Sequence, residues 1–273
     1  MADVSVNGVV QDRILARDSA LLTDAVREAG ALALSLFGTD LKNWTKGASS
    51  PVSEADIRVN DLLENRLRSA TPDYGWLSEE SADDEARLNK PLVWIVDPID
   101  GTRGYLAGRE DWCVSVALVE NGSALLAAVF APASEEFFFA ARGQGAMRNA
   151  APVFATSGTE IDFSRVAGPK PLVERLARPS DEIILHPRIG SLALRLCRVA
   201  DGSLDAAFAG GQSRDWDLAA ANLIVQEANG NMTALSGDAI LYNRREVTHG
   251  VLVAAGRERH ASIVEYFRKR PLP

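Results

Sequence analysis

Two apolar runs joined by an Asn-Gly pair constrain the fold of this sequence more than any other feature. The runs cover residues 113–120 and 123–130, with Asn-Gly at 121–122. A two-residue Asn-Gly connection favours a type I′ turn, whose twist matches that of an antiparallel strand pair. The sequence therefore predicts a β-hairpin, which the apolar run at 93–96 and a further strand at 135–141 extend into an antiparallel meander.

Helical spacing of apolar residues predicts helices on both sides of this meander. The predicted helices cover residues 12–37, 53–69, 171–178, 191–199, 216–228 and 257–269, and short strands are expected at 166–167, 182–185, 204–208 and 251–255. Strands and helices alternate after residue 163. This pattern predicts two closely packed halves, an N-terminal α+β half over 1–160 and a C-terminal α/β half over 161–273.

The charge balance argues against a nucleic-acid polymer as partner. There are 29 Lys and Arg against 37 Asp and Glu, a net charge of −8, and the basic residues are scattered rather than clustered. The first residues lack a basic region followed by an apolar core, and the longest nearly apolar run has about half of the ~20 residues that a membrane span needs. We therefore expect a cytoplasmic protein with no membrane partner.

The end of a predicted strand brings two carboxylates together. Pro98 is expected to force a turn after Asp97, so that Asp100 returns beside it. If a helix begins next, the free N–H groups of Gly101 and Thr102 would face an anion beside these acids. Mg²⁺ suits that arrangement, because it takes oxygen ligands and bridges carboxylates to phosphate. A turn whose Asp side chains only cap backbone groups would give the same pattern.

Three further acids occur in comparable places. Glu79 follows a short apolar strand and precedes Glu80, and such adjacent like charges need solvent or a cation to screen them. Asp217 lies where an apolar helix begins, and Asp56 lies in the first turn of the helix predicted at 53–69. Solvated strand ends and helix N-caps are the structural alternatives for these positions.

Taken together and in this order, these segments resemble the inositol monophosphatase superfamily of Mg²⁺-dependent, lithium-sensitive sugar and nucleotide phosphatases. The resemblance is carried by PVSEAD at 51–56, SEES at 78–81, WIVDPIDGT at 94–102, GSLALRLCRVADGSLDAAF at 190–208 and WDLAAANLIVQEANG at 216–230. It implies a mixed α+β and α/β chain folded as the layered α/β/α/β/α sugar-phosphatase sandwich. It also implies hydrolysis of a phosphomonoester without a covalent enzyme intermediate.

The resemblance assigns metal ligands to positions of this sequence. One Mg²⁺ would be held by Glu79, Asp97 and the carbonyl of Ile99, and a second by Asp97, Asp100 and Asp217. Two such cations can activate a water, neutralise phosphoryl oxygens and stabilise the departing alkoxide.

The resemblance also assigns catalytic and phosphate-binding residues. Thr102 and Glu79 would orient the attacking water, and Asp56 with Glu79 would serve a third, weaker ion. The phosphate would lie beside Asp100, on the amides of Gly101 and Thr102.

The segments that flank these motifs favour one substrate class. Inositol-specific members carry a Glu shortly before the Trp-Asp motif, where this chain has Ala-Gly-Gly at 209–211. The flanks at 77–84 and 103–112 look closer to bacterial 3'(2'),5'-bisphosphate nucleotidases. The resemblance therefore implies removal of the 3'-phosphate of adenosine 3',5'-bisphosphate.

A second substrate phosphate needs a cation of its own. Lys170, Arg188 and Arg214 are the candidates, with a plain surface role as the alternative for each. An inositol-1-monophosphatase or broad sugar phosphatase activity stays open, as does a non-catalytic phosphate-binding role. Family members are often dimers, so a homodimer is compatible with the resemblance.

Overall fold

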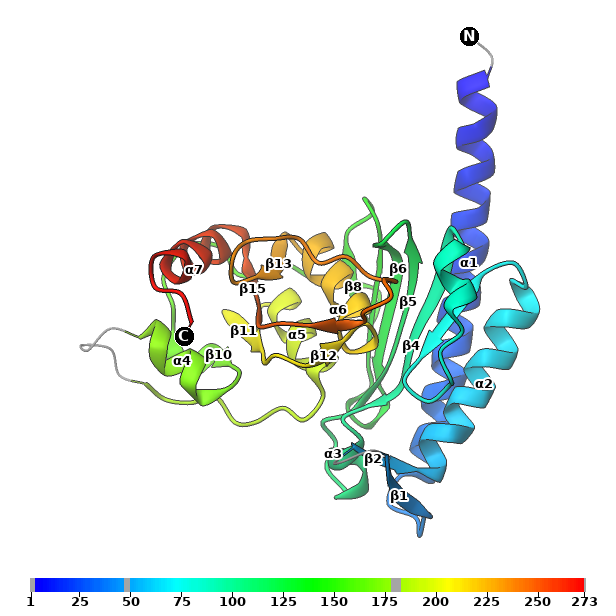
Figure 1. The fold of residues 1–273 in the computed structure, drawn as a ribbon, viewed down its shortest axis with the longest axis horizontal. Coiled ribbons are helices and arrows are strands. Elements are labelled where there is room, and N and C mark those ends of the chain that lie inside the picture. The colour runs from blue at the N-terminus through cyan, green and yellow to red at the C-terminus, as the bar shows by residue number, and fades with distance from the viewer. Residues whose placement is uncertain (1–2, 47–49, 178–182, 273) are drawn as a thin grey trace.

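Five layers of helices and sheets make up the computed structural model, which describes residues 3–46, 50–177 and 183–272 (Figure 1). The helices are α1 (Asp3–Leu36), α2 (Glu54–Ala70), α3 (Thr102–Leu106), α4 (Lys170–Leu176), α5 (Leu192–Ala200), α6 (Asp215–Glu227) and α7 (Arg257–Lys269). Helices α1 and α2 cover one face of a large sheet, and α5 and α6 lie between that sheet and a smaller one. Helices α4 and α7 form the outermost layer. The layered mixed α/β fold predicted from the sequence is confirmed.

The large sheet has seven strands in the order β3-β4-β5-β6-β7-β8-β9. They are β3 (Gly75–Ser78), β4 (Leu92–Asp100), β5 (Cys113–Glu120), β6 (Ser123–Ala131), β7 (Glu136–Ala141), β8 (Ala146–Arg148) and β9 (Ala151–Pro152). Only the pair β3-β4 is parallel. Strands β5 and β6 form the predicted hairpin, with positive φ angles of 50° at Asn121 and 83° at Gly122, as a type I′ turn requires.

The small sheet has four strands in the order β10-β11-β15-β13. They are β10 (Val166–Ala167), β11 (Ala206–Ala209), β15 (Leu252–Gly256) and β13 (Gly230–Ala234). Two short ribbons pair β1 (Asn43–Lys46) with β2 (Ser50–Ser53) and β12 (Ser213–Arg214) with β14 (Thr248–His249). These ribbons and strand β13 are too short or too polar to stand out in the sequence.

Three hydrophobic cores separate the layers. The outer cores lie between α1, α2 and the large sheet, and between the small sheet and α4 and α7. The middle core takes side chains from both sheets and encloses α6, which explains why that helix is apolar around most of its circumference. Helices α5 and α6 therefore pack on the large sheet, while the division of the chain into two halves at residues 160 and 161 stays a prediction.

Strand β4 carries two of the acids and differs from the sequence prediction. It continues through Pro98 to its end at Asp100 instead of turning after Asp97. Its register against β5 shifts between Asp97, opposite Ser115, and Asp100, opposite Cys113, so the segment is a β-bulge. A bulge is one of the few places where a strand accepts proline. The predicted turn is therefore wrong, and the bulge brings the two carboxylates together instead.

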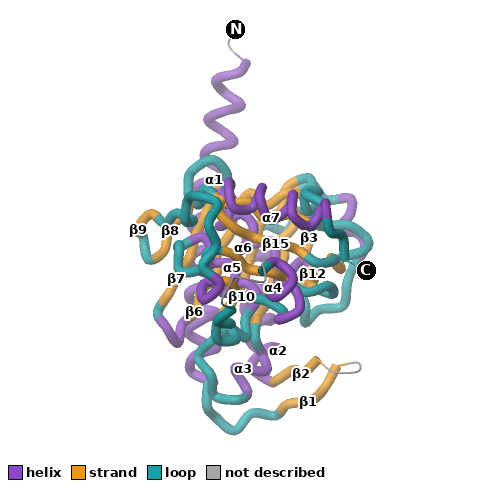
Figure 2. Tube along the Cα trace, turned by 90° about the vertical axis from the view of Figure 1, so that its left-hand side faces the viewer, coloured by secondary structure: helices purple, strands orange, loops and turns teal. Residues whose placement is uncertain are grey.

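Helix α1 begins well before the predicted start at residue 12. It starts at Asp3, and its first turns stand clear of the rest of the molecule in both views (Figure 1, Figure 2). Once nucleated, a helix gains one hydrogen bond for each residue it fixes, and no proline lies between residues 3 and 12 to stop it.

The strand predicted at 182–185 is wrong for residues 183–185. Ile184 and Leu185 are exposed, and no strand of the described residues pairs with this segment. Glu182, and Arg178 at the end of the helix predicted at 171–178, lie outside the described residues.

None of the described helices has the length and apolarity needed to cross a bilayer.

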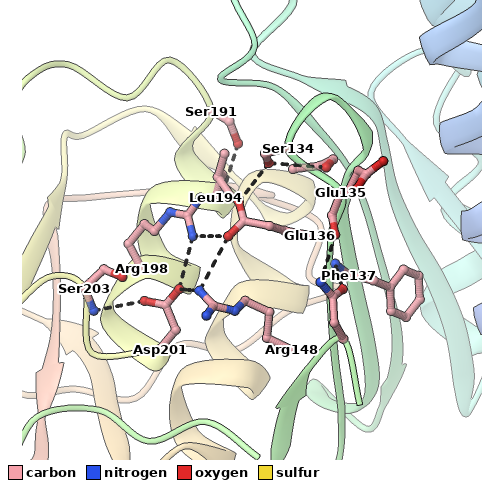
Figure 3. Close-up of polar contacts among 12 residues, drawn as sticks. Ser134, Glu135, Glu136, Phe137, Arg148, Ser191, Leu194, Arg198, Asp201 and Ser203 are labelled. Carbon is pink, nitrogen blue, oxygen red and sulfur yellow. Dashed lines mark hydrogen bonds and ion pairs between the residues drawn. The ribbon is translucent and has the colours of Figure 1, made fainter. Parts of the chain in front are cut away.

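Four charged side chains join the large sheet to the end of α5 (Figure 3). Arg198 binds both Glu136, through two nitrogens, and Asp201, at 3.1 Å. Arg148 approaches the same two acids, at 3.5 Å and 2.8 Å. Burial alone would raise the pKa of Glu136, but hydrogen bonds from Arg198 and Ser134 and the charges of both arginines lower it. The cluster therefore links β7 and β8 to the C-terminal end of α5.

Replacing Arg198 with Met is expected to lower the free energy of unfolding by about 2 kcal/mol, because it leaves two largely buried carboxylates short of a partner. Urea unfolding measures the loss. The matched control is Arg66→Met, which breaks an ion pair with Glu28 whose partners are 52% and 50% exposed. That change should cost less than about 1 kcal/mol. Equal losses in the two variants would contradict the assigned role of the cluster.

Candidate active site

A cleft of about 560 Å³ lies where the acidic segments meet. Its walls come from Glu79 after β3, from residues 97–104 at the end of β4 and in α3, from residues 188–192 before α5, and from residues 210–217 at the start of α6. Elements from both predicted halves therefore build one cleft.

Three aspartates meet at the bottom of this cleft. One carboxylate oxygen from each of Asp97, Asp100 and Asp217 lies within 4.8 Å of the other two. Asp97 and Asp100 are buried, and Asp217 is half-buried. Among the described residues, no Lys or Arg side chain forms an ion pair with any of the three. The bulge in β4 and the first turn of α6 thus bring together acids that are remote in sequence.

Backbone N–H groups orient two of these carboxylates. Oδ1 of Asp97 accepts a hydrogen bond from the N–H of Ile99 at 3.0 Å, within the bulge. Oδ2 of Asp217 accepts one from the N–H of Arg214 at 2.7 Å, which caps the first turn of α6. Each carboxylate keeps a second oxygen with which it can ligate a cation.

Asp100 is held by the N-terminal end of α5. Its Oδ2 accepts hydrogen bonds from the Ser191 hydroxyl and from the N–H of Ala193, both at 2.6 Å. Ser191 is the N-cap of α5, and its Oγ also accepts from the N–H of Leu194 at 2.9 Å. The sequence predicted a helix starting at residue 191, but its contact with Asp100 depends on tertiary packing and had no local signal.

Asp56 and Thr102 form a neighbouring pair. Oδ2 of Asp56 accepts from the N–H and the hydroxyl of Ser53, at 2.8 Å and 2.5 Å, where Ser53 caps α2. The Thr102 hydroxyl lies 3.0 Å from Oδ1 of Asp56 and 2.9 Å from the carbonyl oxygen of Ile99. A hydroxyl has one proton, so it donates to one of these two acceptors at a time. Asp56 is buried, and this desolvation raises its pKa.

Gly101 occupies a backbone position of the site that strongly favours glycine. Its φ is 97°, and it is the N-cap residue of α3. A Cβ there would lie 3.1 Å from the carbonyl oxygen of Asp111 and 3.2 Å from the backbone nitrogen of Ser191. A helix therefore begins at Thr102, where the sequence analysis placed a possible helix start.

The acids of the cleft raise one another's pKa values. Burial raises the pKa of Glu79 to about 8, and the charges of Asp217, Glu80 and Asp100 add to the rise. Burial followed by the charge of Asp100 raises the pKa of Asp217 to about 7. Desolvation also raises the pKa values of Asp97 and Asp100. Ionising all four groups in this space is therefore unfavourable unless a cation offsets their charge.

The donor set fits Mg²⁺. The cluster offers only oxygen atoms, which Mg²⁺ prefers, and it offers no imidazole or thiolate of the kind that zinc favours. Glu79, Asp97, Asp100, Asp217 and the carbonyl of Ile99 are the groups that line the cleft and could hold such an ion. They are the ligands that the resemblance implied.

The three cationic candidates for substrate binding lie in different places. Arg188 lines the cleft. Lys170 does not, and its Nζ lies 3.5 Å from Oε1 of Glu174 on the surface of α4. The side chain of Arg214 also lies outside the cleft, with its guanidinium 5.9 Å from the ring centre of Trp216. Neither Lys170 nor Arg214 is among the residues that line the cleft, and their roles in substrate binding stay predictions.

Two arginines that the sequence analysis did not select line the cleft. They are Arg103 and Arg109. Arg103 directly follows Thr102 in the sequence, and this adjacency was the available signal. Arg109 lies beside Asp111, with Nε 3.3 Å from Oδ1, a contact that follows from the loop after α3.

Comparisons with known proteins agree with this geometry. A model of the Inositol monophosphatase family matches residues 16–272. An inositol-1-monophosphatase from Rhizobium meliloti is 33% identical over 268 residues, which cover 93% of this chain and 96% of that one. A Nus factor SuhB from Xylella fastidiosa is 33% identical over 231 residues, 80% of this chain and 82% of that one. The solved structure of a Thermotoga maritima IMPase matches with a TM-score of 0.77 at 25% identity, covering 94% and 97% of the two chains.

Mg²⁺ is expected to raise the melting temperature more at pH 8 than at pH 6. In the folded, metal-free protein Glu79 and Asp217 titrate at about 8 and about 7, whereas carboxyls of an unfolded chain titrate near ~4. Between these values the folded protein keeps protons that the unfolded chain has lost, so its stability falls as the pH rises. Mg²⁺ removes that cost. Thermal melts with and without millimolar Mg²⁺ at both pH values measure the effect.

Two controls make this measurement specific. Burial lowers the pKa of His260 to about 4, so the contribution of His260 to the stability of the protein falls as the pH falls, opposite to the contribution of the two acids. This contribution is the same with and without Mg²⁺ and cancels in the difference between the two melts. The variant Asp217→Asn should lose most of the Mg²⁺ effect at pH 8. A Mg²⁺ effect of equal size at both pH values would refute the explanation.

Proposed function

The chain belongs to the inositol monophosphatase family of phosphatases, and from this premise we propose that it hydrolyses small phosphomonoesters with two Mg²⁺ ions bound in the cleft. The observation that carries the proposal is that one carboxylate oxygen from each of Asp97, Asp100 and Asp217 lies within 4.8 Å of the other two. In this proposal Glu79, Asp97 and the Ile99 carbonyl hold one ion, and Asp97, Asp100 and Asp217 hold the other. A third ion beside Glu79 and Asp56 is a further part of it.

Bound Mg²⁺ neutralises phosphoryl oxygens and makes a water more acidic. The chain's own groups then have separate roles in our proposal. When the Thr102 hydroxyl donates to Asp56, its lone pairs are free to accept a hydrogen bond from a water and so orient that water for attack. Glu79 lines the cleft beside the proposed ions and is the carboxylate that we propose takes up the proton that the water loses. The backbone at Gly101 and Thr102, beside Asp100, is the proposed phosphate-binding site.

Asp217→Asn is expected to reduce turnover of any phosphomonoester substrate by at least about 1,000-fold, since it removes a charged ligand from one of the two proposed Mg²⁺ ions. Phosphate release under saturating Mg²⁺ measures the loss. Asp238→Asn, which changes an exposed acid outside the cleft, is the control and should keep full activity.

The same experiment tests a non-catalytic role. One relative is named a Nus factor, and a protein of this fold could bind a phosphate group without hydrolysing it. Two outcomes would support that role and contradict the catalytic proposal. One is that the wild-type protein does not hydrolyse any of a panel of phosphomonoesters, and the other is that Asp217→Asn leaves turnover unchanged.

For the substrate we propose a phosphomonoester that carries a second anionic group, with adenosine 3',5'-bisphosphate as its representative. A second cavity of about 330 Å³ adjoins the cleft, and Arg188 lines both. Arg103 and Arg109 add positive charge on the cleft wall. No carboxylate stands at Gly210 and Gly211, where a polar contact to an inositol hydroxyl would be expected from the family resemblance.

Inositol 1-phosphate is the second candidate. It is favoured by the Rhizobium meliloti relative, which is named an inositol-1-monophosphatase and matches over nearly the whole of both chains. Adenosine 3',5'-bisphosphate, adenosine 3'-monophosphate, inositol 1-phosphate and histidinol phosphate, assayed side by side with Mg²⁺, separate the classes. A tenfold preference for inositol 1-phosphate would overturn the bisphosphate proposal.

Arg188→Met is expected to reduce the preference for adenosine 3',5'-bisphosphate over adenosine 3'-monophosphate by about tenfold in kcat/KM. The change removes a charge-assisted contact to the second phosphate, and such contacts are worth about 1.5–3 kcal/mol. Lys170→Met is the matched control, because Lys170 lies outside the cleft. If the two substrates lose activity equally in Arg188→Met, the arginine does not recognise the second phosphate.

A further inference from the structure

Two of the proposed metal ligands, Glu79 and Asp217, come from segments that no strand pairing joins. Glu79 begins the loop after β3, and Asp217 lies in the first turn of α6, which packs on the large sheet from the other predicted half. A site for a small ion tolerates little variation in the distance between such ligands. Contacts behind the cleft connect the two segments.

Arg87 anchors the far end of the Glu79 loop. It lies in the short helix η1 (Glu85–Asn89) and is only 2% exposed. Its Nε and Nη2 donate to the two carboxylate oxygens of Asp83, at 2.6 Å and 2.8 Å. This two-pronged contact fixes the orientation of both side chains. The loop that starts at Glu79 is therefore tied to η1 at Asp83.

The remaining nitrogen of Arg87 reaches a segment 156 residues away. Nη1 donates to Oδ1 of Asn243 at 2.7 Å and to the carbonyl oxygen of Arg244 at 3.1 Å. Asn243 returns a hydrogen bond from Nδ2 to the carbonyl oxygen of Arg87 at 3.3 Å. Its backbone N–H then donates to Oδ2 of Asp215 at 2.7 Å. The contacts thus lead from the Glu79 loop to the first residue of α6.

Asp215 completes the connection without entering the cleft. It is fully buried, and its Oδ1 lies 2.6 Å from Nε2 of His249. Its backbone N–H donates to the carbonyl oxygen of Val247 at 3.0 Å. The start of α6 is therefore attached to the 243–249 segment at three points, and Asp217 follows two residues later. None of Arg87, Asn243, Asp215 and His249 lines the cleft.

We propose that Arg87, Asn243, Asp215 and His249 form a positioning chain that fixes the distance between Glu79 and Asp217 and thereby sets the affinity of the cleft for Mg²⁺. The inference rests on the proposed function only in naming the ion that the cleft binds. The four residues touch neither substrate nor ion, so they act through the two acids. Removing such supporting contacts around metal sites typically lowers metal affinity by about 10–100-fold.

Arg87→Met and Asp215→Asn test the positioning chain. Arg87→Met cuts the link between Asp83 and Asn243, and Asp215→Asn keeps the size of the side chain while removing its charge. The full-length variants are titrated with Mn²⁺ by calorimetry, without substrate. Their Mg²⁺ half-saturation, kcat and KM are measured in parallel. We expect both the Mn²⁺ Kd and the Mg²⁺ half-saturation concentration to rise at least about tenfold, with kcat at saturating Mg²⁺ within about threefold of wild type.

Glu85→Gln is the matched control. Glu85 accepts from Nη2 of Arg245 at 3.0 Å, so this exposed pair joins the same two segments on the surface without reaching Asp215. Its loss should leave the Mn²⁺ Kd unchanged. Arg87→Lys, which keeps the charge but not the two-pronged geometry, should give an intermediate Kd.

The results separate this inference from the proposed function. A variant that melts at a lower temperature but binds Mn²⁺ with the wild-type Kd shows a purely structural role and overturns the inference. A lower kcat at saturating Mg²⁺ with an unchanged Kd overturns it as well. If wild type lacks phosphatase activity while the variants still bind Mn²⁺ more weakly, the proposed function fails and the positioning chain stands. Should Arg87→Met not fold, Asp215→Asn decides by the same criteria.

Discussion

Repulsion between acids that the fold brings close together is the constraint on which the rest of this structure depends. Asp97, Asp100 and Asp217 approach within 4.8 Å of one another, and the fold has to hold them there against their own charges. It does so with backbone N–H groups and a hydroxyl that each bind one carboxylate oxygen. A cation bound in the cleft, as proposed above, would therefore contribute to the stability of the fold as well as to the chemistry.

The layered architecture places two helix N-termini at this cleft. Helix α5 begins beside Asp100, and α6 begins with the turn that carries Asp217. The N-terminal end of a helix carries a partial positive charge, so both ends offset some of the negative charge of the acids. Both helices lie between the two sheets. Apolar packing in the middle core thus sets the direction of α5 and α6, and through these helices it sets the geometry of the site.

Local patterns revealed the acids but not their geometry. A short apolar strand that ends in Asp or Glu is visible in the sequence, so Glu79, Asp97 and their partners could be selected in advance. The form of the chain at Pro98 depends on the register against β5, which is a tertiary property, and the predicted turn is a bulge. The position of each basic side chain relative to the cleft depends on tertiary packing in the same way. Nothing local distinguishes Lys170, which faces solvent, from Arg188, which lines the cleft.

The middle core contains side chains of both sheets and of the two helices between them. Separating α5 and α6 from the large sheet would therefore expose a large apolar face to water. In evolutionary terms the two parts are bound to change together. New specificities in such a chain are expected to arise in the loops around the rim, such as the one that carries Arg188, rather than by exchange of a whole half with another protein.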